Sequence, residues 1–141
     1  MPARQPEECG LLLIEAIEKG DLEAAVALYE PNASFVVPPG EVVSGHSAIR
    51  EVLSGFMAAM AGGKIEAVTV AVSGDGTVAV TRTKGSSTAV GPDGEPVTMP
   101  FHSIEVVRKQ PDGTWRFIID DPAGEGSRVV PVNWQAQDGA K

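Results

Sequence analysis

Two ionisable side chains, His102 and Asp120, lie in a segment predicted to fold as a β-hairpin, and both are candidates for proton transfer. The strands are expected over residues 97–109 and 114–121, because Asp112-Gly113 between β-prone runs is a strong tight-turn signal. His102 shares its predicted strand face with apolar residues, so we expect it to face an apolar interior. There it would donate a hydrogen bond or shuttle a proton near neutral pH. The alternative is a buried imidazole held by one backbone or carboxylate partner.

Asp120 is followed directly by a second acid, Asp121. Adjacent residues of a strand point to opposite faces, so the two cannot form a carboxylate dyad and only one can face a cavity. We expect Asp120 to be the cavity acid. The alternative is an ion pair between Asp120 and Arg82 or Arg108.

The N-terminal part of the chain predicts two helices that would help to position these groups. The first is expected over residues 6–19, where apolar residues recur at helical spacing and Gly20 follows. Asp21 is expected to cap the second helix, and Pro31 to stop it. We therefore interpret Asp21 as a structural residue.

Two short strands, over residues 32–37 and 41–44, lead into a longer helix over residues 46–61. His46 begins this helix, and we expect it to have a capping role. The apolar residues of the helix fall on one continuous stripe that must lie against an apolar surface. They are Ile49, Val52, Leu53, Phe56, Met57 and Met60.

The second half of the chain is predicted to be β-structure. Gly62-Gly63 is expected to break the helix, and residues 64–73 and 77–90 are two further strands before the hairpin. Asp-Gly turns separate the four strands, which indicates an antiparallel meander. The expected fold is therefore α+β, with about five to six strands curved around three N-terminal helices and an apolar cavity left between them.

Length and composition indicate one domain, over residues 1–122, and a tail over residues 123–141. Within this tail, residues 129–134 are expected to add an edge strand or a dimer contact. The net charge of −8 argues against nucleic-acid and anionic-membrane partners. A single cysteine, two histidines and no phosphate-binding loop argue against a disulfide, a metal site and a nucleotide cofactor. The apolar run near the N-terminus is too short for a signal peptide or a membrane span, so a cytoplasmic location is expected. We also expect no cofactor.

Four segments together resemble a known superfamily. Residues 20–29, 32–38 and 45–50 resemble the N-terminal half of nuclear transport factor 2-like proteins, and residues 108–122 are similar to the SnoaL-like and ketosteroid-isomerase-like branch. The resemblance implies a cystatin-like conical α+β barrel, often a homodimer, with a ligand cavity between sheet and helices. It does not imply one activity, because the superfamily contains both enzymes and noncatalytic association domains.

The residues that ketosteroid isomerases of this fold use are replaced in this chain. In those enzymes an aspartate base directly precedes a proline, and this chain has Val37 in place of that aspartate. Their oxyanion-hole tyrosine corresponds to Leu13. Their second oxyanion-hole residue, an aspartate, corresponds to His102. Glu41 is the one acid that we expect to be able to replace the missing base. A steroid isomerase with the usual machinery is therefore not expected.

Three functions follow as hypotheses. The leading one is a dimeric domain that binds a small, largely apolar molecule, with His102 and Asp120 as polar anchors. The second is a cofactor-independent isomerase, cyclase or hydratase in which His102, Asp120 and Glu41 transfer protons, and the third is a noncatalytic dimeric association module. The predicted ligand-binding residues are Leu13, Ile17, Phe35, Val37, Phe56, Met57, Met60, Ile104 and Ile118.

Overall fold

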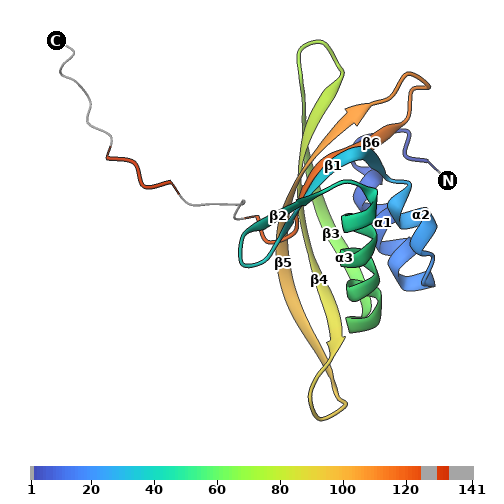
Figure 1. The fold of residues 1–141 in the computed structure, drawn as a ribbon, viewed down its shortest axis with the longest axis vertical. Helices are drawn as coiled ribbons and strands as arrows, with labels where there is room; N and C mark the ends of the chain where they lie inside the picture. The colour runs from blue at the N-terminus through green and yellow to red at the C-terminus, as the bar shows by residue number, and fades with distance from the viewer. Residues whose placement is uncertain (1, 125–129, 134–141) are drawn as a thin grey trace.

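A computed structural model describes residues 2–124 and 130–133, and it has the predicted α+β architecture (Figure 1). Helices α1 (Glu8–Lys19) and α2 (Leu22–Val26) are followed by strands β1 (Tyr29–Val37) and β2 (Glu41–Ser44), and then by helix α3 (His46–Ala59). Strands β3 (Met60–Val72), β4 (Val78–Val90), β5 (Pro96–Lys109) and β6 (Trp115–Asp121) complete the fold. The three helices lie together on one side of the sheet (Figure 1).

The six strands form one sheet in the order β2-β1-β6-β5-β4-β3. All neighbouring strands are antiparallel except β1 and β6, which run parallel. The first strand in the sequence therefore lies beside the last one. Strands β3 to β6 form the meander that the Asp-Gly turns predict, and β4 and β5 pair over thirteen residues. The curved sheet and the helices thus enclose one layer of side chains.

Local signals explain most element boundaries. Asp21 accepts a hydrogen bond from the backbone N–H of Ala24 at 3.1 Å, as its predicted capping role requires. Gly20 ends α1 with a φ of 67°, a left-handed conformation that favours glycine.

Two boundary predictions are wrong. Helix α3 ends at Ala59, and Gly62-Gly63 lies inside β3, paired with β4, because the sheet supplies backbone hydrogen bonds that local sequence does not reveal. Strand β1 begins three residues earlier than predicted, at Tyr29. In the tail, residues 130–133 lie outside any strand and are exposed, the rest of the segment, residues 129 and 134, lies outside the described residues, and the alternative of a dimer contact stays a prediction.

Aromatic side chains from two strands form the centre of the core. The rings of Tyr29 and Phe117 are 4.8 Å apart between centroids, and those of Tyr29 and Phe35 are 6.1 Å apart. Phe56 from α3 contacts Phe35 edge-on at 5.8 Å. These contacts fix α3 and β1 relative to β6, the strand that carries Asp120.

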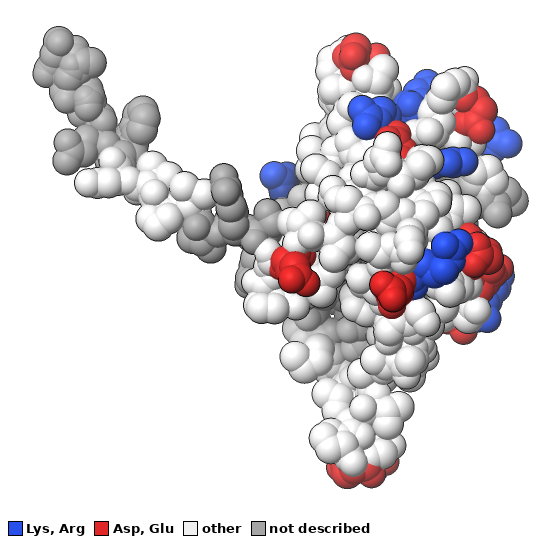
Figure 2. All heavy atoms as spheres, viewed as in Figure 1, with Lys and Arg blue, Asp and Glu red and all other residues white. Residues whose placement is uncertain are grey.

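The viewed surface has no gathered basic patch: Lys and Arg stand singly or beside Asp and Glu (Figure 2). Ion pairs such as Arg50 with Glu23 and Arg108 with Glu30 have this mixed character. Within the described part of the chain, no helix is long and apolar enough to cross a membrane.

Candidate functional site

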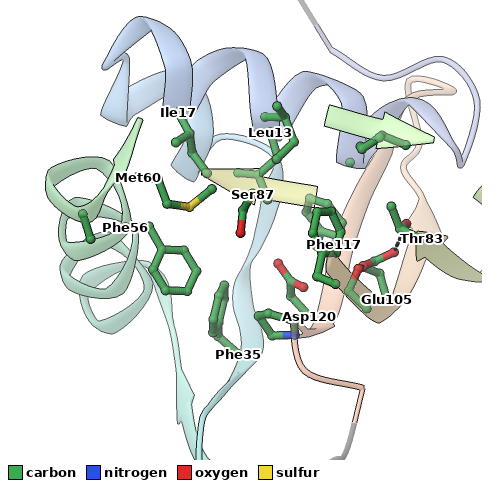
Figure 3. A pocket seen from close by; sticks show the side chains of 17 residues that line it. Leu13, Ile17, Phe35, Phe56, Met60, Thr83, Ser87, Glu105, Phe117 and Asp120 are labelled. Carbon is green, nitrogen blue, oxygen red and sulfur yellow. Dashed lines mark hydrogen bonds between the residues drawn. The ribbon is translucent and has the colours of Figure 1, made fainter. Parts of the chain in front are cut away.

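A cavity of about 370 Å³ lies between α1, the end of α3 and the concave face of the sheet (Figure 3). Most of its lining is apolar, and the polar side chains come from β4, β5 and β6. The apolar lining includes Leu13, Ile14, Ile17, Phe35, Phe56, Ala59, Met60, Ile65, Phe101, Phe117 and Pro122. Such a cavity, largely apolar with a few placed polar groups, is typical of small-molecule sites.

Burial divides the cavity into a closed end and an open end. The side chains of Glu105, Asp120 and Phe117 are each 5% exposed or less, whereas Ala59 is exposed and Phe101 is half-buried. The acids therefore lie at the closed end.

Asp120 reaches this closed end because β6 contains a β-bulge. In the ladder between β5 and β6, Val106 pairs with Ile119 and Val107 pairs with Phe117, so Ile118 is the extra residue. The bulge puts Phe117 and Asp120 on the same face, although they are three residues apart. The hydroxyl group of Tyr29 donates a hydrogen bond to Oδ2 of Asp120 at 2.6 Å.

Glu105 lies on β5 directly opposite Asp120 in the ladder, and it also lines the cavity. Its carboxylate accepts three hydroxyl hydrogen bonds: Thr81 (2.6 Å) and Thr83 (2.8 Å) donate to Oε1, and Ser103 donates to Oε2. Figure 3 shows Thr83 beside Glu105, with Asp120 nearby. Three side chains from two strands thus hold one buried carboxylate in place.

The surroundings of Asp120 raise its pKa to about 7. Burial is the main cause, since it disfavours the charged form, and the negative charges of Glu105 and Asp121 add to it. The hydrogen bond from Tyr29 acts in the opposite direction and lowers the pKa. Burial and the neighbouring Asp120 raise the pKa of Tyr29 well above its usual range, so the phenol stays a donor. Asp120 can therefore give or take a proton near neutral pH.

The structure contradicts the predicted positions of His102 and Glu41. His102 is exposed on the convex face of the sheet, because on β5 it is Ser103 and Glu105 that point inward. Glu41 is exposed on the edge strand β2, outside the cavity lining. Of the three predicted proton-transfer residues, only Asp120 lies in the cavity. Its contact with Tyr29 also replaces the alternative ion pair, since Arg108 instead binds Glu30 at 2.9 Å.

His46 begins α3, as predicted, but makes no capping hydrogen bond through its side chain. Its Nε2 instead lies 2.8 Å from the backbone oxygen of Tyr29. Because that oxygen is an acceptor, Nε2 must carry a proton. His46 therefore ties the start of α3 to β1.

Five of the nine predicted ligand-binding residues line the cavity: Leu13, Ile17, Phe35, Phe56 and Met60. Val37 and Met57 instead pack against the core without lining the cavity. Ile104 and Ile118 are also absent from the lining, because Ile104 alternates with the inward residues of β5 and Ile118 is the bulge residue of β6.

Sequence reasoning missed Tyr29 and Glu105. The helix expected between Asp21 and Pro31 includes Tyr29, and only the pairing of Tyr29 with Phe117 of the distant strand β6 shows that it begins β1. For Glu105, a signal was present: Thr81, Thr83, Ser103 and Glu105 alternate along two strands predicted to be neighbours. Within the described ranges, no group of three or more His, Cys, Asp or Glu residues is placed to hold a metal ion.

The sequence that forms this fold and its cavity matches a known family over most of the chain: residues 12–118 match the SnoaL-like domain. The chain belongs to the SnoaL-like family. None of the curated proteins compared with the chain is similar enough to count as a relative.

Solved structures agree on the fold of this SnoaL-like protein. A proposed dehydratase of the nuclear transport factor 2-like family from Streptomyces avermitilis has a TM-score of 0.70 at 23% identity, over 82% of this chain and 90% of that one. A ketosteroid isomerase-like protein from Erwinia carotovora atroseptica has a TM-score of 0.66 at 18% identity, over 81% and 88%. A protein with a cystatin-like fold from Novosphingobium aromaticivorans has a TM-score of 0.66 at 19% identity, over 80% and 75%. At these identities the likeness establishes the fold.

Proposed function

We propose that this SnoaL-like protein binds a small, largely apolar molecule in the cavity of its cone. The observation that carries the proposal is the cavity of about 370 Å³, apolar except for the buried carboxyl groups and hydroxyls at its closed end and the hydroxyl of Ser87 toward its open end. A core built only for stability would fill this space, since protein interiors pack densely. An association module needs neither the space nor the acids.

Direct binding measurements with a fluorescent naphthalene derivative test this proposal. Ala59 lines the open end of the cavity and is exposed, so Ala59→Trp should narrow the entrance and reduce affinity. His102→Ala is the matched control, because this side chain lies on the convex face. Loss of binding in both variants, or in neither, would contradict the proposed location.

A second candidate function is cofactor-independent proton transfer with Asp120 as the acid or base, as in an isomerase, cyclase or hydratase. The favouring observation is a carboxyl group that lines the cavity with a pKa of about 7. In an isomerisation, the carboxylate would take a proton from one carbon of the bound molecule and return it to another, so that no further reactant is needed. The proton-transfer groups of this candidate are Asp120 and its hydrogen-bond donor Tyr29.

Incorporation of solvent deuterium into bound carbon acids tests this candidate. The rate should fall by at least about a hundredfold in Asp120→Asn, the usual minimum contribution of a positioned acid or base. Binding affinity in the same variant separates lost chemistry from lost binding. An unchanged rate would leave the protein as a binding domain.

We further propose that the binding unit is a homodimer. Two exposed apolar side chains, Val42 of β2 and Ile119 of β6, support this proposal. Sedimentation equilibrium should give the mass of two chains; the mass of one chain would rule the dimer out.

A further inference from the structure

The hydrogen bonds at the closed end of the cavity all run in one direction. The hydroxyl protons of Thr81, Thr83 and Ser103 point to Glu105, and that of Tyr29 points to Asp120. Each of these hydroxyls has a single proton, so none retains one for a ligand. What remains free at this end is oxygen lone pairs.

One acceptor atom in particular is unused. No hydrogen bond within the described residues reaches Oδ1 of Asp120, although this residue is only 4% exposed and lines the cavity. In Figure 3 its carboxyl group points into the space between Ser87 and Phe35. Every buried side-chain oxygen of the described residues has a hydrogen-bond partner, so Oδ1 must be accessible from the cavity, where a ligand or water can supply its proton.

Charge adds to this asymmetry. Glu105 and Asp120 both line the cavity, while no Lys, Arg or His does so among the residues that the structure describes. The ionisable groups that act on Asp120 are Tyr29 from β1, Glu105 from β5 and Asp121, the next residue of β6. Cys9 of α1, which acts on Tyr29, is a thiol whose pKa is raised to about 12, mainly by burial. None of these groups supplies a positive charge.

We propose that the ligand enters with a hydrogen-bond donor at its leading end, and that a protonated amine on an apolar body is the preferred class. This inference rests on the proposed binding function and specifies its ligand. An ammonium group would donate to Oδ1 of Asp120 and to the free lone pairs around Glu105, and it would offset the charge of both acids. A ketone or ester would bring only a further acceptor.

The hydroxyl of Ser87 is the exception among the lining side chains. It has no hydrogen-bond partner within the described residues, and it is half-buried on β4, four residues from Thr83 and therefore about 13 Å along the strand. An acceptor group would bind there, toward the open end. Ser87→Ala removes this donor and leaves the closed end unchanged.

Four probes with the same aromatic body distinguish the possibilities: naphthyl ethylamine, naphthyl ethanol, acetylnaphthalene and ethylnaphthalene. In that order, the probes offer a charged donor, a neutral donor, an acceptor alone and no polar group. The amine stays protonated up to about pH 10, as alkyl amines do. At about pH 8, Ser87→Ala should bind the amine at least about tenfold more tightly than the ketone or the hydrocarbon, which corresponds to one charge-assisted contact. The alcohol should lie between them.

The pH dependence gives an independent test in the unmutated protein. Binding of a cation favours the ionised form of Asp120, so a proton should leave when the amine binds. Affinity for the amine should then rise about tenfold from about pH 6 to about pH 8, because the acid titrates between these values. In Ser87→Ala, affinity for the ketone should fall over the same range, since protonated Asp120 is then the remaining lining group that can donate to it.

Two isosteric variants locate the effect. Glu105→Gln and Asp120→Asn should each weaken amine binding by about tenfold or more and leave the hydrocarbon within about twofold, whereas His102→Ala should change neither. The inference is wrong if the ketone binds Ser87→Ala as tightly as the amine, or if amine affinity is independent of pH. If none of the four probes binds, the proposed binding function itself has failed.

Discussion

Replacing Asp120 with Asn should change how the stability of the protein depends on pH. The pKa of Asp120 is about 7 in the folded protein, against an ordinary value of 3.8. Between these values the folded state holds a proton that the unfolded state has released, so its stability is greatest below about pH 4 and falls as pH rises to about 7. The difference is about three pKa units at about 1.4 kcal/mol each, or about 4 kcal/mol in total. This is a large part of the 5–15 kcal/mol that typically stabilises a domain (about 0.1 kcal/mol per residue).

Asn has the same shape, accepts the hydrogen bond from Tyr29 through its amide oxygen, and does not ionise. We expect the free energy of unfolding, measured in urea at a series of pH values, to become larger for Asp120→Asn relative to the unmutated protein as pH rises from about 4 to about 8. Asp93→Asn, the same substitution in the exposed β4–β5 turn, is the matched control. A difference for Asp120→Asn that does not change with pH would show that the acid is not strongly perturbed, and it would refute the electrostatic reasoning for the site.

Two further changes test the site and its frame. Tyr29→Phe removes the donor to Oδ2 of Asp120, so the pKa of this acid should rise by about one unit. The pKa can be followed by carbon NMR, and an unchanged or lower value would contradict the role of the phenol. Gly85→Ala places a Cβ atom in overlap with the backbone oxygen of Lys64 and 2.9 Å from the ring of Phe101, which should cost about 1–3 kcal/mol of stability in urea unfolding. Gly55→Ala, in open space on α3, is its control and should stabilise the helix by up to about 1 kcal/mol, so equal effects of the two changes would refute the packing argument.

The fold was predictable because its signals are local. Asp-Gly turns mark each turn of the meander, Asp21 and Gly20 mark helix ends, and the apolar stripe of α3 requires a sheet beneath it. The boundary of β1 was missed because Tyr29 becomes a strand residue only through pairing with β6, about ninety residues away. Local sequence carries no information about such a partner.

The face of β5 was predicted wrongly for a different reason. Ile104 and Val106 made the face of His102 look apolar, and apolar faces are usually the buried ones. The opposite face, with Phe101 and Val107, lies inward instead, and it includes Glu105 because hydroxyls on β4 satisfy this carboxylate. The preference of a strand for one face therefore depended on its neighbour.

Asp120 was predicted to face the cavity, and it does so only because of the bulge at Ile118. Strict alternation from the buried residue Phe117 would have directed Asp121 inward instead. Asp120 has the strand parity of Ile118, which is predicted from the sequence to line the cavity, but Ile118 is the residue that the ladder skips. The placement was therefore reached through a wrong premise, and the bulge had no visible signal in the sequence.

The cluster around Glu105 and Asp120 cannot be explained by stability. Burying a carboxylate costs several kcal/mol, and hydrogen-bonded partners at best offset that cost, whereas apolar residues of similar volume usually fill such a space with equal or better stability. This chain nevertheless places two acids and four hydroxyls at the closed end of an unfilled cavity, with their protons directed at one another. The arrangement lowers stability as pH rises from about 4 to about 7 and leaves a free acceptor facing the cavity. Both properties follow if the cluster exists to meet a donor that the protein itself does not contain.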